Sequence, residues 1–258
     1  AIEVSLANAK EGLIRLPINQ NRITALAEKD MTVIGGTTAD KGLSPYLFAA
    51  NIKNQEMVAT YDLDNAIAGQ HAIAAGFVKC SQGNMFAGTL SDEEGGSGHI
   101  IMVAFDGKNF KVTDLGTPVE GEGVYSLALD KKANVMYGMT YPHGKFFSRD
   151  MSSGEVNVYE EAMGSERARR TLHHLHLNPE QYISREIVID NAGRVFGSMP
   201  YNQFFCFDPA KKEVKVIDTP LPEVWGRNTL ARVDAMTLGP DGMIYGGNGA
   251  DGQLFKLN

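Results

Sequence analysis

The sequence predicts an all-β protein, mainly because two short signatures each occur five times. The first is a turn followed by an apolar or aromatic position and a small residue; it is centred on Ile34, Phe86, Tyr137, Phe196 and Tyr245. The second is an apolar residue three positions before Asp or Asn; it occurs as Phe48/Asn51, Val103/Asp106, Phe147/Asp150, Phe205/Asp208 and Phe255/Asn258. The centres are 52, 51, 59 and 49 residues apart. Because repeats of roughly 40 to 50 residues built from short strands are typical of propeller blades, we predict a five-bladed β-propeller with four-stranded antiparallel blades.

The outermost strand of four blades is visible as a short segment, and apolar and polar residues alternate in the last two. These segments are Glu56-Met57-Val58-Ala59, Phe110-Lys111-Val112-Thr113, Glu155-Val156-Asn157-Val158 and Glu213-Val214-Lys215-Val216. No such segment follows the fifth centre, but Glu3-Val4-Ser5-Leu6 has the same pattern. We expect this N-terminal strand to complete the last blade and close the ring, since closure protects strand edges from aggregation.

Residues 1–258 are therefore predicted to form a single domain with blade centres near residues 34, 86, 137, 196 and 245. An open α/β sheet is the alternative architecture. It requires helical periods between the strands, and only residues 161–176 offer one candidate.

Composition limits the partners and the compartment. The net charge of −7 argues against nucleic acid, and no apolar run approaches the roughly 18 residues of a membrane span. Cys80 and Cys206 fall in different blades, which predicts two free thiols. A start at Ala1 fits removal of a signal peptide and equally fits loss of an initiator Met. A periplasmic or secreted location is slightly favoured, and the oligomeric state stays open.

One face of the predicted ring carries the long loops. Variable loops on a rigid scaffold are where binding and catalysis concentrate. All six histidines fall on this face: His71, His99, His143, His173, His174 and His176. So do eight of the ten arginines: Arg15, Arg22, Arg167, Arg169, Arg170, Arg185, Arg227 and Arg232. Since the planar fork of arginine binds carboxylate in bidentate fashion, this distribution favours an anionic ligand, although many acidic residues share the face.

The start of each innermost strand and the adjacent loops should crowd the central mouth of this face. Tyr141, His143 and Arg185 are the candidate catalytic residues: arginine would neutralise the carboxylate of a uronic acid, and His or Tyr would move the proton. The candidate ligand-binding residues are Arg22, His71, Tyr125, Tyr201, Asn202, Trp225, Arg227 and Arg232. The structural alternative is that Arg22, Arg185 and Arg232 pair with acidic residues across blades and hold the ring together.

A metal site is a further candidate. His174 and His176 share one face of an extended segment, whereas His173 and His176 share one face of a helix. Either pair could bind zinc with His143 or a carboxylate, but no complete spaced motif is present, and solvated loop histidines are the competing interpretation. The acidic, Gly-rich residues 89–98 lack the regular spacing of a calcium loop, so calcium stays a minor alternative. No cofactor is otherwise predicted.

Two blade phrases, 189–197 (IDNAGRVFG) and 252–258 (GQLFKLN), resemble the generic blades of bacterial β-propeller repeat proteins. The resemblance covers nearly the whole chain and implies the fold, whereas such blades serve lectins, lyases, hydrolases and scaffolds alike. Propeller polysaccharide lyases use His, Tyr and Arg on the loop face, and this chain has those residue types there, but no individual motif matches.

Three functions follow as hypotheses, and whether the chain is an enzyme stays open. The leading one is binding of an anionic saccharide or small acid in the central pocket, with polysaccharide or oligosaccharide lyase activity as its sharper form. The second is a non-catalytic lectin or protein-interaction scaffold around Trp225, which predicts a shallow apolar face and no polar pocket at the axis. The third is a metal-dependent hydrolase built on His173, His174 and His176.

Overall fold

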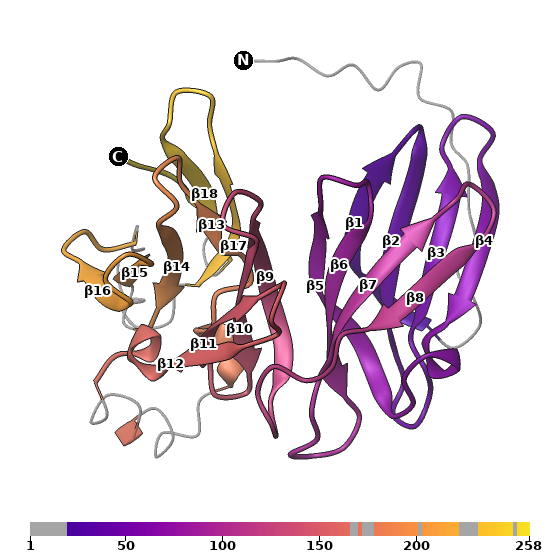
Figure 1. The fold of residues 1–258 in the computed structure, drawn as a ribbon, viewed down its shortest axis with the longest axis horizontal. Coiled ribbons are helices and arrows are strands. Elements are labelled where there is room, and N and C mark those ends of the chain that lie inside the picture. The colour runs from indigo at the N-terminus through magenta and orange to yellow at the C-terminus, as the bar shows by residue number, and fades with distance from the viewer. Residues whose placement is uncertain (1–19, 166–169, 172–177, 201–202, 222–231, 250–251) are drawn as a thin grey trace.

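The computed structural model describes residues 20–165, 170–171, 178–200, 203–221, 232–249 and 252–258 (Figure 1). Strands dominate these ranges, so the predicted all-β class is confirmed. These ranges also contain three short 3₁₀ helices, η1 (Leu63–Asn65), η2 (Glu160–Met163) and η3 (Pro179–Gln181).

The strands fall into five consecutive antiparallel units. Unit 1 has β1 (Gln20–Lys29), β2 (Thr32–Ala39), β3 (Tyr46–Asn51) and β4 (Glu56–Asp62). Unit 2 has β5 (Gln70–Lys79), β6 (Met85–Ser91), β7 (Ile100–Phe105) and β8 (Phe110–Asp114). Unit 3 has β9 (Gly123–Asp130), β10 (Val135–Tyr141), β11 (Phe146–Asp150) and β12 (Val156–Tyr159). Unit 4 has β13 (Val188–Ile189), β14 (Val195–Met199), β15 (Gln203–Asp208) and β16 (Glu213–Ile217), and unit 5 has β17 (Val233–Leu238), β18 (Ile244–Asn248) and β19 (Leu254–Leu257).

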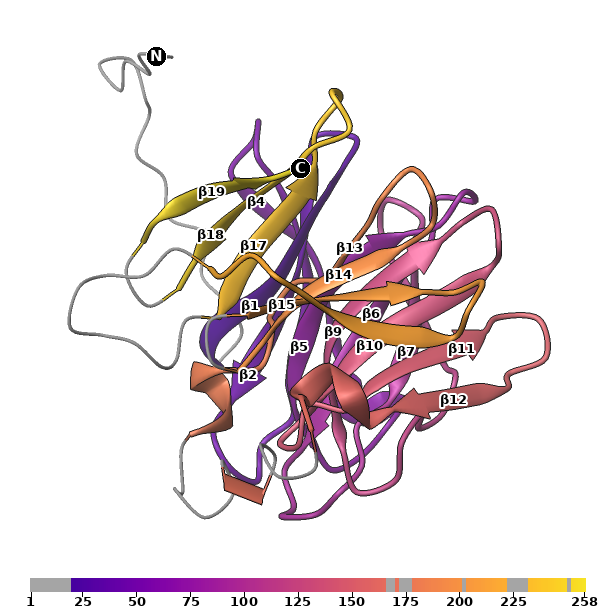
Figure 2. The ribbon, with the colours of Figure 1, turned by 90° about the vertical axis from the view of Figure 1, so that its left-hand side faces the viewer.

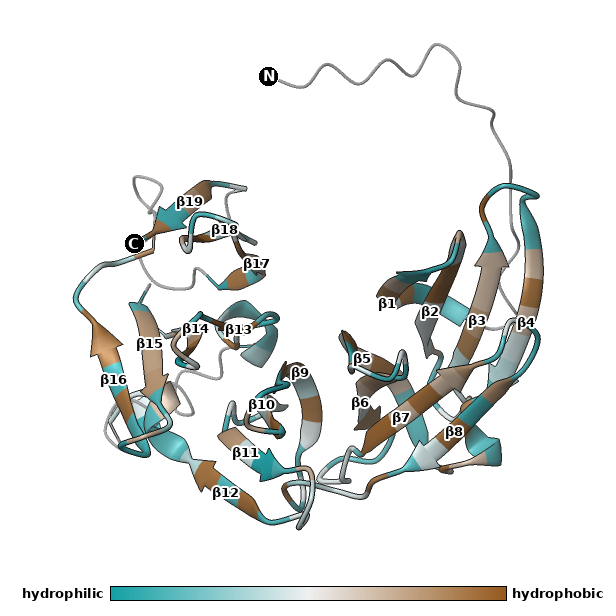
Figure 3. Cartoon of the chain, turned by 45° about the horizontal axis from the view of Figure 1, so that its top comes forward, coloured by the Kyte–Doolittle hydropathy of each residue, from teal (hydrophilic) through white to brown (hydrophobic). Residues whose placement is uncertain are grey.

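The units are arranged as an arc with their first strands innermost (Figure 3). Units 3, 4 and 5 are separate sheets, whereas units 1 and 2 form one sheet through the single pair Thr38↔Ala72. The predicted outermost strands near 56–59, 110–113, 155–158 and 213–216 are confirmed as β4, β8, β12 and β16. Figure 2 shows units 4 and 5 from the side, with the strands of units 1 and 2 behind them.

The two repeated signatures of the sequence are cross-strand neighbours. Gly35 pairs with Phe48, Gly138 with Phe147, Gly197 with Phe205 and Gly246 with Phe255. In each pair a methyl group on the glycine would overlap the phenylalanine ring. The second strand needs glycine at this position because the phenylalanine ring of the third strand lies directly over its backbone. Unit 2 has Ala87 opposite Ile101 instead, where the partner is not aromatic.

The Asp or Asn of the second signature closes the turn after the third strand. Asp106 Oδ1 accepts hydrogen bonds from the backbone N–H groups of Lys108 at 2.8 Å and Asn109 at 2.7 Å. Asp150 Oδ1 does the same for Ser152 and Ser153, at 2.8 Å each. These backbone donors hold the pKa of both carboxyls below its usual value. These turns therefore have a structural role.

The hydrophobic core is divided into four clusters, and each lies between two successive units. Units 1 and 2 share the cluster with Ile34 and Ile101, and units 2 and 3 share the one with Ile100 and Phe147. Units 3 and 4 share the largest, in which Phe146 packs against Phe205 and Phe207 with ring centroids 5.3 and 5.1 Å apart. Units 4 and 5 share the last, where Phe204 meets Phe255 edge-on at 5.1 Å.

Ring closure is not seen in the described part of the chain. None of the four clusters joins unit 5 to unit 1, and Figure 3 shows the arc open between them. Ile23 and Leu26 of β1 are 43% and 58% exposed, as expected for a strand that no following unit covers. The N-terminal strand predicted near residues 3–6 lies outside the described residues, so five closed blades remain a prediction.

Two smaller expectations concern the thiols and the membrane. Cys80 and Cys206 are free and partly buried. Across the described ranges, the chain has no helix with the length and hydrophobicity that a membrane crossing requires.

Candidate functional site

A cavity of about 680 Å³ lies at the centre of the arc, on the loop-rich face. Every unit contributes a residue at or near the start of its innermost strand: Arg22, His71, Tyr125, Glu186 and Asp234. Tyr141, the last residue of β10, and Pro142 after it also line the cavity. Because innermost strands converge at the axis of such a fold, residues far apart in sequence meet here.

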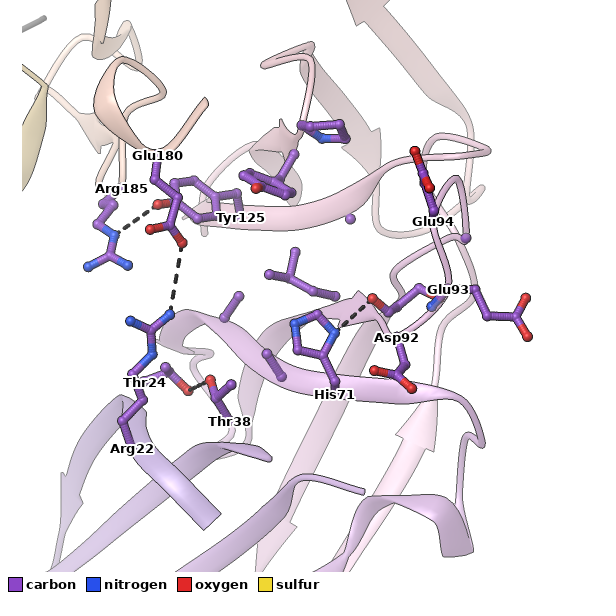
Figure 4. Close-up of a pocket in the computed structure, with 18 of the residues that line it drawn as sticks. Arg22, Thr24, Thr38, His71, Asp92, Glu93, Glu94, Tyr125, Glu180 and Arg185 are labelled. Atoms are coloured by element: carbon purple, nitrogen blue, oxygen red, sulfur yellow. Dashed lines mark hydrogen bonds and ion pairs between the residues drawn. The ribbon is translucent and has the colours of Figure 1, made fainter. Parts of the chain in front are cut away.

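Arg185 is the best-placed cation of the cavity. Its Nε donates a hydrogen bond to the Tyr125 hydroxyl at 2.9 Å, and its guanidinium carbon lies 5.7 Å from the Tyr125 ring centroid (Figure 4). Burial opposes the charge, but the hydrogen bond to Tyr125 and the nearby carboxylates of Asp234 and Glu180 hold the pKa of Arg185 above its usual value. No carboxylate of the described residues forms an ion pair with Arg185. Its terminal N–H groups are therefore available to a ligand.

Two further arginines of the predicted mouth, Arg22 and Arg232, are already paired. Arg22 lies 3.8 Å from Glu180, which belongs to the link between units 3 and 4, so this contact crosses units as the structural alternative predicted. Both side chains are largely solvated, and such a pair contributes little to stability. Arg232 Nε contacts Asp234 Oδ1 at 2.5 Å within its own segment, and only Asp234 lines the cavity.

Two tyrosines form one wall of the cavity. The rings of Tyr125 and Tyr141 are stacked, with centroids 5.6 Å apart and planes 30° apart. Burial, followed by the charge of Glu180 and the proximity of Tyr125, raises the pKa of Tyr141. Tyr141 is therefore a neutral proton donor at neutral pH, next to the ring that orients Arg185.

His143 does not join Tyr141 and Arg185 in this cavity. Its Nδ1 lies 2.7 Å from Oε1 of Glu122, and its side chain is 63% exposed. Glu122 is 2% exposed and also contacts Thr140 at 2.9 Å and Lys145 at 3.3 Å. The buried carboxylate thus holds both ends of the 140–145 loop, and that loop presents Tyr141 to the cavity.

The Glu122 contact is one version of a polar arrangement that recurs in successive units. In each of units 1, 2 and 3 a buried hydroxyl at the end of the second strand forms a hydrogen bond with a side chain at the start of the first strand. The same hydroxyl accepts a hydrogen bond from the backbone N–H at or just before the start of the third strand. In unit 1 Thr37 bonds Gln20, and in unit 2 Thr89 bonds Gln70 at 2.7 Å. Unit 3 has Glu122 where the first two units have glutamine. Among the described residues, only Glu122 is also contacted by a histidine and a lysine, His143 and Lys145.

His71 has a fixed orientation on the cavity wall. Its Nδ1 lies 2.7 Å from the carbonyl oxygen of Ser91. A carbonyl only accepts hydrogen bonds, so Nδ1 carries a proton, and Nε2 of the neutral ring is free of one. Figure 4 shows the ring between Arg22 at one end of the cavity and the acidic loop of Asp92, Glu93 and Glu94 at the other.

Glu186 is a cavity residue that the sequence analysis did not single out. Burial raises the pKa of its carboxyl from 4.5 to about 7. The carboxyl has no hydrogen bond or ion pair with another of the described residues; only its backbone carbonyl is engaged, by the Ser184 hydroxyl at 2.5 Å. Its place directly after Arg185, at the start of an innermost strand, was the available signal, but the loop face holds too many carboxylates for position alone to select it.

Several predicted site residues lie outside the described residues: Tyr201, Asn202, Trp225, Arg227, His173, His174 and His176. Among the residues that are described, no group of three or more His, Cys, Asp or Glu side chains could hold a metal ion. The zinc hypothesis therefore depends entirely on the undescribed histidines.

Comparison with known proteins supports the fold. No protein-family model and no curated protein match the sequence. Among solved structures, the Dos1 propeller matches with a TM-score of 0.56 and 16% identity, over 91% of this chain and 55% of that chain. A calcium-binding regucalcin from Agrobacterium tumefaciens gives 0.58 and 15%, over 92% and 75%, and the periplasmic gluconolactonase PpgL of Pseudomonas aeruginosa gives 0.55 and 10%, over 91% and 71%.

Some of the similar solved chains are much longer, and this chain spans only 28%, 55% and 65% of three of them. Identities of 10–16% carry no information about ligand or activity. The likeness therefore assigns the chain a β-propeller-like fold.

Proposed function

We propose that the central cavity binds a small saccharide acid and that the guanidinium of Arg185 holds its carboxylate. The observation that carries this proposal is the Tyr125 hydrogen bond, which fixes Arg185 through Nε and leaves its terminal N–H groups without a carboxylate partner among the described residues. A guanidinium held in this way binds a carboxylate in bidentate fashion at a small entropic cost.

The dimensions and lining suit such a ligand. A volume of about 680 Å³ lies within the range of roughly 300–1,000 Å³ that is typical of small-molecule sites. The stacked Tyr125 and Tyr141 offer an aromatic wall to the apolar face of a sugar ring. Arg22, which is exposed and only loosely held by Glu180, could bind a second acidic group.

The reaction that this arrangement favours is β-elimination from a 4-linked uronate, the lyase form of the hypothesis. Arg185 would neutralise the carboxylate and so make the adjacent C5–H more acidic, and Tyr141 is a neutral hydroxyl on the same wall. His143 would act indirectly, because it and Glu122 hold the loop that carries Tyr141.

Calorimetric titration with galacturonate and galactose tests the proposal. The acid should bind at least about tenfold more tightly than the neutral sugar, because one charge-assisted contact contributes about 1.5–3 kcal/mol. Arg185→Gln should abolish this preference, whereas Arg149→Gln on β11, away from the cavity, should keep it. Equal affinity of the wild-type protein for both sugars, or no binding of either, would refute the proposal.

Hydrolysis of a sugar lactone is a second candidate, since a regucalcin and a gluconolactonase are among the similar structures. The product of such a reaction is also a sugar acid, which Arg185 could hold. Incubation with glucono-1,5-lactone distinguishes the two reactions, because hydrolysis releases acid without creating a double bond. A lectin or interaction scaffold built on Trp225 predicted no polar pocket at the axis, and the charged cavity argues against it.

We also propose that residues 3–6 complete unit 5 as its fourth strand and so produce five closed blades. The exposed side chains of β19 support this: Leu254 is 87% exposed at an edge that a further strand would cover. Leu6→Asp should lower the melting temperature, while Ser5→Asp on the opposite side of the same strand should change it little. Similar melting temperatures for both variants and the wild type would count against closure by this segment.

A further inference from the structure

Two titratable groups of the central cavity, His71 and Glu186, have no role in the binding of a carboxylate by Arg185. Both line the cavity, and they come from units 2 and 4, which are not neighbours in the arc. The Ser91 carbonyl fixes the tautomer of His71, and burial raises the pKa of Glu186. A base and an acid on the walls of one cavity are what acid–base catalysis requires.

His71 is prepared to accept a proton. The Ser91 carbonyl at 2.7 Å fixes the proton of the neutral ring on Nδ1, so the lone pair is on Nε2. Figure 4 shows this ring in the cavity, on the side opposite Tyr125 and Arg185. A ligand whose carboxylate is bound by Arg185 would therefore have His71 across from it.

Glu186 is prepared to give a proton. Glu186 lines the cavity, and its carboxyl has no hydrogen bond or ion pair with any described residue, so no donor among them stabilises the anion. Burial alone raises the pKa of this carboxyl to about 7, so at neutral pH it retains a proton far more than a solvated glutamate does. Glu186 and Arg185 line the same cavity.

We propose that His71 and Glu186 divide the proton transfers of the cavity's reaction, with His71 Nε2 as the base and the Glu186 carboxyl as the acid. This rests on the proposed uronate elimination. His71 takes the C5 proton reversibly, which leaves a carbanion that the adjacent carboxylate delocalises. The C4–O bond then breaks as the carbanion electron pair becomes the C4=C5 double bond, and the leaving oxygen takes the proton of Glu186. His71 releases its proton to water and Glu186 takes one up, so no oxidant or reductant is needed.

Leaving-group dependence separates the two roles. The substrates are digalacturonate, whose leaving group is a sugar alkoxide, and a 4-O-nitrophenyl uronate, whose leaving group needs no proton. Glu186→Gln should lower kcat on digalacturonate by about 10²–10⁴-fold and on the nitrophenyl substrate by less than about tenfold. His71→Gln should lower kcat by about 10²-fold or more on both. His99→Gln and Glu161→Gln, which change a histidine and a glutamate outside the cavity, are the matched controls.

Deuterium exchange provides a second readout that loss of packing would not imitate. In heavy water the wild-type protein and Glu186→Gln should introduce deuterium at C5 of recovered substrate, whereas His71→Gln should not. Unchanged kcat in either variant, or equal losses on both substrates for Glu186→Gln, overturns the division of roles.

Calorimetry with galacturonate distinguishes a failure of this inference from a failure of the proposed function. A wild-type protein that binds galacturonate through Arg185 but gives neither elimination nor C5 exchange overturns the proton-transfer roles and leaves the binding function intact. A wild-type protein that does not bind the acid overturns both.

Discussion

Arg185 and Tyr125 are 60 residues apart in the chain, yet Nε of Arg185 donates to the Tyr125 hydroxyl at 2.9 Å. The contact joins unit 3 to the segment that begins unit 4. The tyrosine ring also lies beneath the guanidinium at 5.7 Å, so one residue orients the arginine by two interactions. The anion-binding capacity of the cavity therefore depends on how two neighbouring units pack.

Tyr125→Phe keeps the ring and removes the hydrogen bond. We expect the affinity for galacturonate to fall by about 3–10-fold, because a single hydrogen bond that fixes a side chain contributes about 0.5–1.5 kcal/mol. The same change in an Arg185→Gln background should have almost no effect, since no oriented cation remains. Calorimetric titration of the two single variants and the double variant measures this coupling, and additive losses would show that Tyr125 acts independently.

Glu122→Ala should lower the free energy of unfolding by about 2–4 kcal/mol. The change leaves the Thr140 hydroxyl, His143 and Lys145 without their common buried acceptor. Glu122→Gln should cost much less, because Gln20 and Gln70 make the corresponding hydroxyl contact in units 1 and 2. Urea denaturation of both variants measures the difference; a glutamine variant as unstable as the alanine variant would indicate that the charge itself is required.

Gly138→Ala should lower the free energy of unfolding by about 1–3 kcal/mol or prevent folding. A methyl group there would overlap the Phe147 ring and lie 2.9 Å from the Ser126 carbonyl oxygen, both of which are buried. Gly76→Ala on β5 is the control, because a methyl group at that position meets nothing within 4 Å. Thermal melting of both variants gives the comparison, and a stable Gly138→Ala protein would contradict the packing reason for the repeat.

The raised pKa of Glu186 makes stability depend on pH. The folded protein retains the Glu186 proton up to about pH 7, whereas the unfolded chain releases it near 4.5. Below pH 4.5 the carboxyl is protonated in both states, so the wild type has its full stability. As the pH rises to about 7 and beyond, the cost of burying the charged carboxylate lowers the free energy of unfolding. Glu186→Gln should therefore gain about 1–3 kcal/mol relative to the wild type between pH 5 and pH 8. Urea denaturation of both proteins at the two pH values checks this; a constant difference would mean that the carboxyl is solvated.

The fivefold pattern of the fold could be predicted because its physical cause is local. Gly138 and Phe147 are nine positions apart, on adjacent strands joined by one loop, so the contact between them leaves a trace at fixed spacing in the sequence. The same holds for Asp106 and Asp150, which bond backbone groups two and three positions ahead. Neither feature needs knowledge of how the units pack together.

The candidate site could be predicted only as a face of the molecule. Arg22, His71, Tyr125 and Arg185 line the cavity because they lie at or near the starts of innermost strands, which the repeat locates. Tyr141 lines it from the end of β10. His143 was expected beside Tyr141, but its direction depends on Glu122, whose burial arises from the packing of unit 3. The role suggested for Glu186 depends on desolvation, and neighbours far away in the chain determine that quantity.

The division of the core into four clusters has a consequence for how the chain can unfold or be rebuilt. Each cluster takes about half of its side chains from one unit and half from the next, so unit 2, 3 or 4 excised alone would keep two half-cores and expose both. Damage to one junction should spread to its immediate neighbours first, as in a chain of nearest-neighbour couplings. The smallest cooperative element of this protein is thus the seam between two units, and a duplication that adds a unit adds one complete seam.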